Sequence, residues 1–526
     1  MTSFPDAASL PNTETAAAIT VRNLVVRAGD QVLLDGADAR FQPGRITLIT
    51  GSSGVGKTIL LRILAGLPDD AGEIHFQGEV RFECVDEPRE TAVGVVFQDF
   101  ALFDEFSPED NVRFARDHSR SSDRPASPAL LLKELDVPAD VRTSSLSGGQ
   151  RQRLAIARTL AFGADVVLYD EPTSGLDRAT AREVVRRIAM THQAHPRTSV
   201  IVTHDYAAFA EIADDIWLMD GETRSLKQID PKDRAHLEDL LRPAEHIPRS
   251  APPTPLNFAI SRVGDLFDAT SRAAFAAIRI PLDIIPVWRS PAWGFRYLLY
   301  YLGLVAGPSA WLYIALSGII IGFVTTYFTF RFLPYASYTE PLLIENLLNA
   351  MGFLLYRILV PVLTTILIAA RSGAAVASDV GCKVHGRQMD ALRTLGAPPR
   401  RYLLTGIVYA FLLGTPFLLM IGWFAATAAS LAVFTVTHPE QGPMFWNLHY
   451  HHELRNPGRV LYDGSAWLLG KVLLCAAGTA LICWYRGAEP KYSSRDVSNA
   501  ITSSVLWATL WVLVVQFVFA FFEFEK

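Results

Sequence analysis

The sequence of 526 residues predicts an α/β P-loop domain followed by an all-α membrane domain of about five transmembrane helices. An apolar, strand-like run, ITLIT, leads directly into the glycine-rich loop GSSGVGKT at residues 51–58, and a helical run follows that loop. Up to about residue 225, charged and apolar residues are mixed as in a soluble domain. After about residue 300 the chain consists of long apolar runs separated by short charged loops, which is typical of a membrane domain.

Shifts in composition divide the chain into five segments. We expect a disordered tail (1–17), an α/β nucleotide-binding domain (18–227), a proline-rich linker (228–256), an amphipathic helical segment in the membrane interface (257–290) and a membrane domain (291–526). A soluble helix packed on the α/β domain is the alternative for the amphipathic segment. The tail lacks the basic start and apolar core of a signal peptide, so the α/β domain is expected on the cytosolic side.

The charge argues against nucleic-acid binding, and the cysteine spacing argues against a cysteine metal site. A net charge of -5 is small for this length, so nucleic acid is not an expected partner. The four cysteines form neither a CxxC pair nor a metal-ligand spacing, and we expect them to be reduced thiols.

The glycine-rich loop is expected to hold the phosphates of ATP. Its glycines let backbone N–H groups face the phosphates, and the following helix adds its positive N-terminal end. Lys57 is expected to reach the β- and γ-phosphates, and Thr58 to bind Mg²⁺. The candidate ATP-binding residues of this loop are Gly51, Ser52, Ser53, Gly54, Val55, Gly56, Lys57 and Thr58.

A second apolar run, DVVLYDEP at 165–172, ends in two adjacent carboxylates. Asp170, at the end of a predicted strand, suits Mg²⁺, either directly or through water. Glu171 is placed to polarise an attacking water as a general base. Without a P-loop the same run would equally fit a strand followed by an acidic turn.

Residues 146–150, LSGGQ, precede a helical run and form a second candidate anion site. The Ser147 hydroxyl and the N–H groups of Gly148 and Gly149 open that helix, where an anion is favoured. The pentapeptide, which Gln150 completes, resembles the signature of ABC transporter ATPases. The resemblance implies that these four residues bind the γ-phosphate of a nucleotide held by a partner ATPase. Because the chain has one P-loop and one signature, we expect a homodimer.

Further motifs follow the order found in that family. Gln98, in VVFQDF, resembles the glutamine of the Q-loop; His204, in IVTHD, resembles the switch histidine; and 174–177, SGLD, resembles the D-loop. The resemblance implies ATP hydrolysis, with Glu171, His204 and Gln98 as catalytic residues, with Thr58, Gln98 and Asp170 as ligands of Mg²⁺, and with ATP and Mg²⁺ as cofactors. One departure is that Arg27 or Ala28 stands where the family usually has an aromatic ring against adenine. An arginine can stack on the base through its planar guanidinium.

Five apolar runs are long enough to span a membrane, roughly 309–331, 342–370, 402–435, 466–485 and 501–522. Basic residues concentrate in the loops 371–401 and 486–500, which the positive-inside rule places in the cytosol. Lys526 is then expected outside. A helix followed by a re-entrant piece is the alternative for 402–435.

The stretch 359–403 contains PVLT, ARSGAAVASDVG, QMDAL and LGAPPRRYL, and it resembles the MlaE/YrbE permease family of the Mla and Mce lipid transporters. Gly373 and Ala377 within it form a small-xxx-small face for close helix contact. The resemblance implies ATP-driven transport of phospholipid or a related lipid in the inner membrane, with a separate MCE-domain protein on the outer face. Ile358 and Arg387 depart from the family, which often has a carboxylate at each position. The alternatives are an exporter of a drug, sterol or glycan, and a regulatory membrane ATPase that transports nothing.

Three further expectations concern single residues. The segment 382–396 is expected to dock near the Q-loop, where Arg387 has Asp99, Asp104 and Glu105 as candidate partners; a solvated basic loop is the alternative. Arg357 and Glu345 are expected near a headgroup, in mutual contact, or in a plain interfacial role. Metal binding and ordinary surface polarity are both open for His449, His451 and His452.

Overall fold

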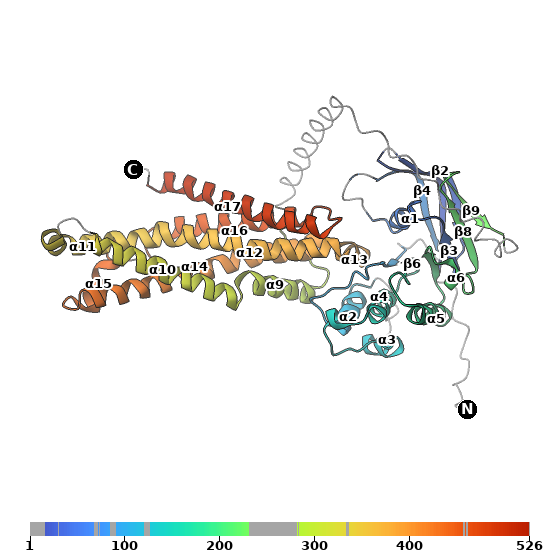
Figure 1. Cartoon of the computed structure of the whole chain (residues 1–526), viewed down its shortest axis with the longest axis horizontal. Helices are drawn as coiled ribbons and strands as arrows, with labels where there is room; N and C mark the ends of the chain where they lie inside the picture. The colour runs from blue at the N-terminus through green and yellow to red at the C-terminus, as the bar shows by residue number, and fades with distance from the viewer. Residues whose placement is uncertain are drawn as a thin grey trace, which may run out of the picture. The chain divides into compact units, whose positions relative to one another are not determined.

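The computed structural model describes residues 16–29, 31–67, 72, 74–84, 91–119, 127–230, 281, 283–332, 336–455, 458 and 461–524. The chain divides into two compact units (Figure 1), Met1–Ile278 with Gly386–Pro399, and Arg279–His385 with Arg400–Lys526. A short piece between two apolar helices thus belongs to the N-terminal unit. Almost all of the predicted tail and linker, most of the amphipathic segment, and Lys526 lie outside the described residues.

The N-terminal unit contains two sheets. One is antiparallel in the order β2-β1-β4, and the other has six strands in the order β5-β6-β7-β3-β8-β9. The strands of the first are β1 (Ala17–Ala28), β2 (Gln31–Phe41) and β4 (Ile74–Cys84); those of the second are β3 (Ile46–Thr50), β5 (Val93–Val96), β6 (Val166–Asp170), β7 (Thr198–Val202), β8 (Asp215–Asp220) and β9 (Ser225–Ile229). Strands β5, β6, β7, β3 and β8 pair in parallel. Strands β3, β6 and β7 are buried throughout, as expected for a parallel sheet covered on both faces, and their carboxyl ends meet at one edge.

Helices, some of them capped by a side chain, follow several of these strands. They are α1 (Lys57–Leu64), α2 (Pro108–Asp117), α3 (Pro128–Glu134), α4 (Gly148–Phe162), α5 (Arg178–Ala194), α6 (Tyr206–Phe209) and α13 (Gln388–Thr394), with a 3₁₀ turn, η2, at Thr143–Ser145. The Asp177 side chain caps α5 by accepting from the backbone N–H groups of Ala179 and Thr180.

The second unit is helical (Figure 1). Its elements are α9 (Pro291–Ala306), α10 (Pro308–Arg331), α11 (Ala336–Leu354), α12 (Val360–His385), α14 (Thr405–Thr437), α15 (Gly442–Tyr450), α16 (Ser465–Ala488) and α17 (Ser494–Phe524), with π-helical turns η4 (Leu355–Leu359) and η5 (Arg400–Leu404). Five segments are long and apolar enough to cross a membrane: Pro291–Arg331, Leu343–His385, Arg400–Thr437, Ser465–Ala488 and Ser494–Glu523. The predicted number of spans is confirmed, and α14 is one helix with no re-entrant piece.

The predicted loop after residue 370 is wrong as far as His385, because α12 continues to that residue. Small residues lower the apolar signal of its second half, yet they allow close packing. A Cβ atom on Gly373 would lie 3.1 Å from Cys483 Sγ of α16, and one on Gly487 would lie 3.2 Å from the Ala377 carbonyl oxygen. The predicted small-xxx-small face therefore packs against α16, beside α12 in Figure 1.

Candidate nucleotide site and its coupling segment

The glycine-rich loop connects β3 to α1 and is shaped by close backbone approach. A Cβ atom on Gly51 would lie 2.5 Å from the carbonyl oxygen of Met219, and Gly56 has φ 105°, so larger residues do not fit at either position. Lys57 Nζ donates to the carbonyl oxygens of Gly51 at 2.9 Å and Ser52 at 3.0 Å. Burial lowers the pKa of the Lys57 ammonium, while Glu171 and Asp170 act to raise it. The loop thus holds a partly desolvated cation beside two carboxylates.

Thr58 and Asp170 lie together where α1 begins and β6 ends. The Thr58 hydroxyl donates to Asp170 Oδ1 at 3.0 Å. Burial raises the pKa of Asp170, and the Thr58 hydrogen bond and the charge of Arg387 partly oppose that rise. A hydroxyl and a carboxylate oxygen at this spacing fit Mg²⁺, which prefers oxygen ligands. Gln98, the third predicted ligand, donates from Nε2 to Ser174 Oγ at 3.3 Å and so joins the Q-loop to the D-loop.

Glu171 and His204 come together because β6 and β7 are neighbours. His204 Nδ1 lies 3.1 Å from Glu171 Oε2. Glu171 has φ 45°, an uncommon conformation for a non-glycine residue, and its N–H donates to the Val202 carbonyl oxygen at 2.8 Å. Strained backbone of this kind is frequent at functional sites. The sequence predicted only that Glu171 and His204 belong to the same site. The structure shows that the two side chains are in direct contact.

The signature residues form the start of α4. Ser147 N donates to Gln150 Oε1 at 2.9 Å, and Gln150 N donates to Ser147 Oγ at 3.3 Å, which is a capping box. A Cβ atom on Gly149 would lie 2.5 Å from Thr180 Cγ2, so α5 is packed closely on this turn. Among the described contacts, none joins Ser147, Gly148, Gly149 or Gln150 to the P-loop of the same chain.

The predicted adenine position lies at the end of β1. Arg27 is exposed and is aligned with Val32 on β2 and His75 on β4. Contact with adenine at Arg27 or Ala28 stays a prediction.

The segment between α12 and η5 contacts the Q-loop region within the N-terminal unit. Arg62 Nη1, on α1, lies 2.7 Å from Asp390 Oδ2, with side chains only 18% and 10% exposed. Gln388 Nε2 donates to Asp104 Oδ2 at 3.0 Å. Arg387 Nε lies 3.9 Å from Asp99 Oδ2 in a more exposed pair. The predicted docking is confirmed, and the solvated basic loop is excluded because Gln388, Met389, Asp390, Ala391 and Leu392 are buried.

The tightest of these contacts was missed by sequence reasoning, which sought partners for Arg387. Arg62 looks like an ordinary polar residue on the helix after the P-loop, and Asp390 like part of the QMDAL run. The available signal was a lone carboxylate in an otherwise basic segment, because such a charge needs a cationic partner when it is buried.

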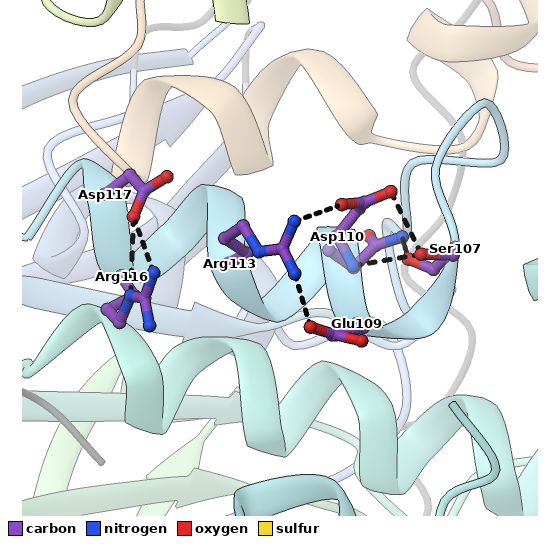
Figure 2. Close-up of polar contacts among 7 residues, drawn as sticks. Ser107, Glu109, Asp110, Arg113, Arg116 and Asp117 are labelled. Carbon is purple, nitrogen blue, oxygen red and sulfur yellow. Dashed lines mark hydrogen bonds and ion pairs between the residues drawn. The ribbon is translucent and has the colours of Figure 1, made fainter. Parts of the chain in front are cut away.

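The Q-loop segment is itself fixed by the start of α2. The Ser107 hydroxyl accepts from Asp110 N at 3.1 Å, and Arg113 pairs with both Glu109 and Asp110 on the following turn (Figure 2). Asn111 accepts from Phe103 N at 2.9 Å and donates to the Phe103 carbonyl oxygen at 3.0 Å. The residues that meet α13 are therefore anchored to the helical part of the same unit.

Charged residues of the second unit pair differently from expectation. Arg357 does not contact Glu345; its Nη2 lies 3.1 Å from Asp463 Oδ2, and its Nε lies 3.7 Å from Glu523 Oε1. Lys471 Nζ lies 3.0 Å from Glu523 Oε2, with side chains 4% and 1% exposed. Arg357 belongs to a π-helical turn, and these contacts direct it towards α16 and α17. Glu345 lies 3.8 Å from His449 Nε2 instead.

The three histidines do not gather into a metal site. No group of three or more metal-ligating side chains occurs among the described residues. His451 is buried, and its Nδ1 lies 3.3 Å from the Tyr462 hydroxyl. Burial and, to a lesser degree, Arg455 lower the pKa of His451 to about 4, so it is neutral at pH 7 and serves in packing.

Comparison with known proteins follows the same division. Residues 34–174 match the family model ABC transporter, and residues 303–522 match the family model Permease MlaE. The chain joins an ABC transporter ATPase domain to an MlaE permease domain. The predicted fusion is thereby confirmed.

Two sequence relatives each cover 38% of this chain. The chain is 39% identical over 212 residues to the sulfate/thiosulfate import ATP-binding protein CysA of Bradyrhizobium diazoefficiens, covering 38% of this chain and 61% of that protein. It is 40% identical over 210 residues to the CysA of Pseudomonas aeruginosa, covering 38% and 63%. The chain therefore spans about three fifths of the length of these relatives. A bacterial ABC transporter cassette solved as a dimer is similar over 40% of this chain and 99% of its own, with 24% identity and a TM-score of 0.34.

Proposed function

We propose that this protein is a homodimeric ATPase of the inner membrane that drives transport of phospholipid or a related lipid. The observation that carries the proposal is the presence, in one chain, of a nucleotide site and an MlaE permease domain joined through α13, which contacts both α1 and the Q-loop. A separate MCE-domain protein on the outer face is the proposed lipid partner.

In the proposed reaction Glu171 polarises the water that attacks the γ-phosphate, and His204 orients Glu171 and the phosphate. The P-loop N–H groups and Lys57 bind the phosphates. When bound, Mg²⁺ supplies positive charge to the phosphates, and Thr58 and Asp170 are the residues placed to hold it. Gln98, held by Ser174, is the proposed sensor between this site and α13.

Sulfate import is the second candidate, because the curated relatives are sulfate/thiosulfate import ATP-binding proteins. Those relatives are ATP-binding proteins that cover 38% of this chain, however, and we expect substrate choice to lie in the membrane part. The described membrane helices offer long apolar surfaces with few charges, which suit acyl chains, since each CH₂ group exposed to water costs about 0.8 kcal/mol. The MlaE match therefore favours lipid over sulfate, and over a drug, sterol or glycan.

ATPase assays of the protein purified in detergent micelles test this proposal, because vesicles would already contain phospholipid. Addition of phospholipid is expected to stimulate hydrolysis, and sulfate is not. Stimulation by sulfate alone would support import, and indifference to every added substrate would support a regulatory ATPase. Mass spectrometry of lipid that co-purifies with the protein would identify the lipid class.

The homodimer leads to a prediction about Ser147. Replacing Ser147 with arginine is expected to abolish hydrolysis in both sites, because each signature completes the site of the partner. A mixed dimer with one Ser147→Arg chain and one Lys57→Ala chain should retain one intact composite site, whereas a dimer with both changes in the same chain and a normal partner should have none. Equal activity of the two mixed dimers, measured after tandem purification, would contradict composite sites.

Topology is a separate prediction from the distribution of Lys and Arg. In intact cells, with the four native cysteines replaced, a membrane-impermeant thiol reagent is expected to label Lys526→Cys and to leave Arg495→Cys unlabelled until the cells are opened. The reverse pattern would overturn the proposed orientation.

A further inference from the structure

Helix α9 contacts both stems of the α13 segment within the membrane unit. The chain enters that segment from the end of α12 and leaves it through η5 into α14. The proposed transport function requires movement of α13 to reach the membrane helices, and these two stems are its covalent connections. Contacts that hold the two stems together therefore determine whether α12 and α14 move together or separately.

The first contact joins α9 to the last turns of α12 through one carboxylate. The Tyr300 hydroxyl donates to Asp379 Oδ1 at 2.7 Å, and the Tyr301 hydroxyl donates to Oδ2 at 3.0 Å. Lys383 Nζ, one turn further along α12, lies 2.7 Å from Asp379 Oδ1. Consecutive helix residues point about 100° apart. The two tyrosine hydroxyls of α9 therefore reach the carboxylate from different directions, and each donates to a different oxygen.

Because the cluster around Asp379 is buried, it tolerates only one relative position of α9 and α12. The side chains of Asp379 and Lys383 are 15% and 5% exposed, and Tyr301 is fully buried. A buried carboxylate is stable only while its hydrogen-bond donors remain in place. A shift between α9 and α12 would separate the donors from Asp379, and this resists independent movement of the two helices.

The second contact joins the start of α9 to the other stem. Trp288 Nε1 donates to the Arg401 carbonyl oxygen at 2.7 Å. The backbone N–H of Ser290, which precedes α9, donates to the Tyr402 hydroxyl at 3.1 Å. Gly294 leaves the space that Trp288 fills, because a Cβ atom there would lie 2.0 Å from the indole.

A third contact fixes the far end of α9 to α12. Arg371 Nη1 donates to the carbonyl oxygen of Leu304 at 2.9 Å, near the end of α9, where a cation is favoured by the helix dipole. Arg371 precedes Asp379 by two helical turns, so α12 holds α9 at two separate points.

We propose that α9 is a brace that binds the two stems of α13 into one rigid body, with Tyr300, Tyr301 and Asp379 as the positioning residues. Through the brace, a displacement of α13 moves α12 and α14 together. Without the brace, α12 and α14 move independently, and less lipid is moved for each ATP hydrolysed. This inference rests on the proposed transport function.

The test is the double variant Tyr300→Phe/Tyr301→Phe, which keeps both rings and removes both hydroxyl donors. In proteoliposomes of phosphatidylethanolamine and phosphatidylglycerol, ATP hydrolysis is expected to stay near the wild-type rate, while lipid moved per ATP falls by about fivefold or more. Tyr313→Phe on α10, where the side chain is exposed, is the matched control and should change neither. Unchanged lipid moved per ATP in the double variant would overturn the brace, and so would a proportional loss of hydrolysis, transport and Tm, which indicates a purely structural role.

A second readout does not depend on lipid transport. In a Glu171→Gln background, ATP binding is expected to change hydrogen exchange of 291–306 together with 376–385 and 400–405. In the double tyrosine variant the response of 291–306 should be weaker than in the parent, because the Trp288 and Arg371 contacts remain, while 376–385 still responds. An identical response in both proteins would overturn the brace, whereas absence of lipid movement by the wild type, with the exchange pattern intact, would refute only the proposed substrate.

Discussion

Replacing Glu171 with glutamine is expected to lower ATP hydrolysis by about 10²-fold or more while ATP binding persists. The amide keeps the size of the side chain but cannot accept a proton from the attacking water. The phosphate-binding loop, Lys57 and the Thr58–Asp170 pair are left intact. Phosphate release and binding of a fluorescent ATP analogue, measured on the same purified protein, check the two halves of this expectation.

A matched control for that variant is Glu211→Gln, because Glu211 is an exposed carboxylate elsewhere in the ATPase domain. It should hydrolyse ATP at the wild-type rate. Turnover near the wild-type rate in Glu171→Gln would remove Glu171 from the role of base, and loss of ATP binding would assign it to the nucleotide cradle instead.

Breaking the Arg62–Asp390 pair is expected to have the second largest effect, on coupling. The pair is short, at 2.7 Å, and mostly buried, and truncating one partner of a desolvated charge pair costs about 2–5 kcal/mol. Asp390→Ala should therefore loosen α13 from α1, so that lipid no longer stimulates ATP turnover although basal hydrolysis continues. The measurement is the ratio of hydrolysis with added phospholipid to basal hydrolysis, both in detergent micelles.

The Arg387–Asp99 pair is the internal comparison for that variant. At 3.9 Å and with 32% and 62% exposure, it is expected to contribute at most about 1 kcal/mol. Arg387→Glu should accordingly reduce stimulation less than Asp390→Ala does, and the exchange Arg62→Asp/Asp390→Arg should partly restore it. A larger effect at Arg387, or no rescue by the exchange, would mean that α13 is not held chiefly by the buried pair.

The sequence predicted the local structure around the candidate nucleotide site because its motifs are contiguous. The strand, loop and helix around Lys57 require a fixed local order, and Asp170 and Glu171 follow directly from a buried strand. The contact between Glu171 and His204 was not predictable in detail, because it depends on the pairing of β6 with β7.

The number of membrane spans was predicted correctly. The length of the helices and the partners of their charged residues were predicted less well. Gly373 and Ala377 signal close packing, yet the same small residues made the second half of α12 resemble a loop. The partners of Arg357 lie more than one hundred residues away, at Asp463 and Glu523. Charge pairs of this kind depend on helix packing, and neither hydropathy nor charge counting specifies them.

ATP-dependent transfer of a labelled phospholipid by the reconstituted full chain is the most direct measure of the central claim. Vesicles that carry the wild-type protein are expected to transfer lipid with ATP and not with a non-hydrolysable analogue, and vesicles that carry Glu171→Gln should transfer none above background. Sulfate uptake should be absent in the same vesicles. ATP-driven sulfate uptake without lipid transfer would contradict the account.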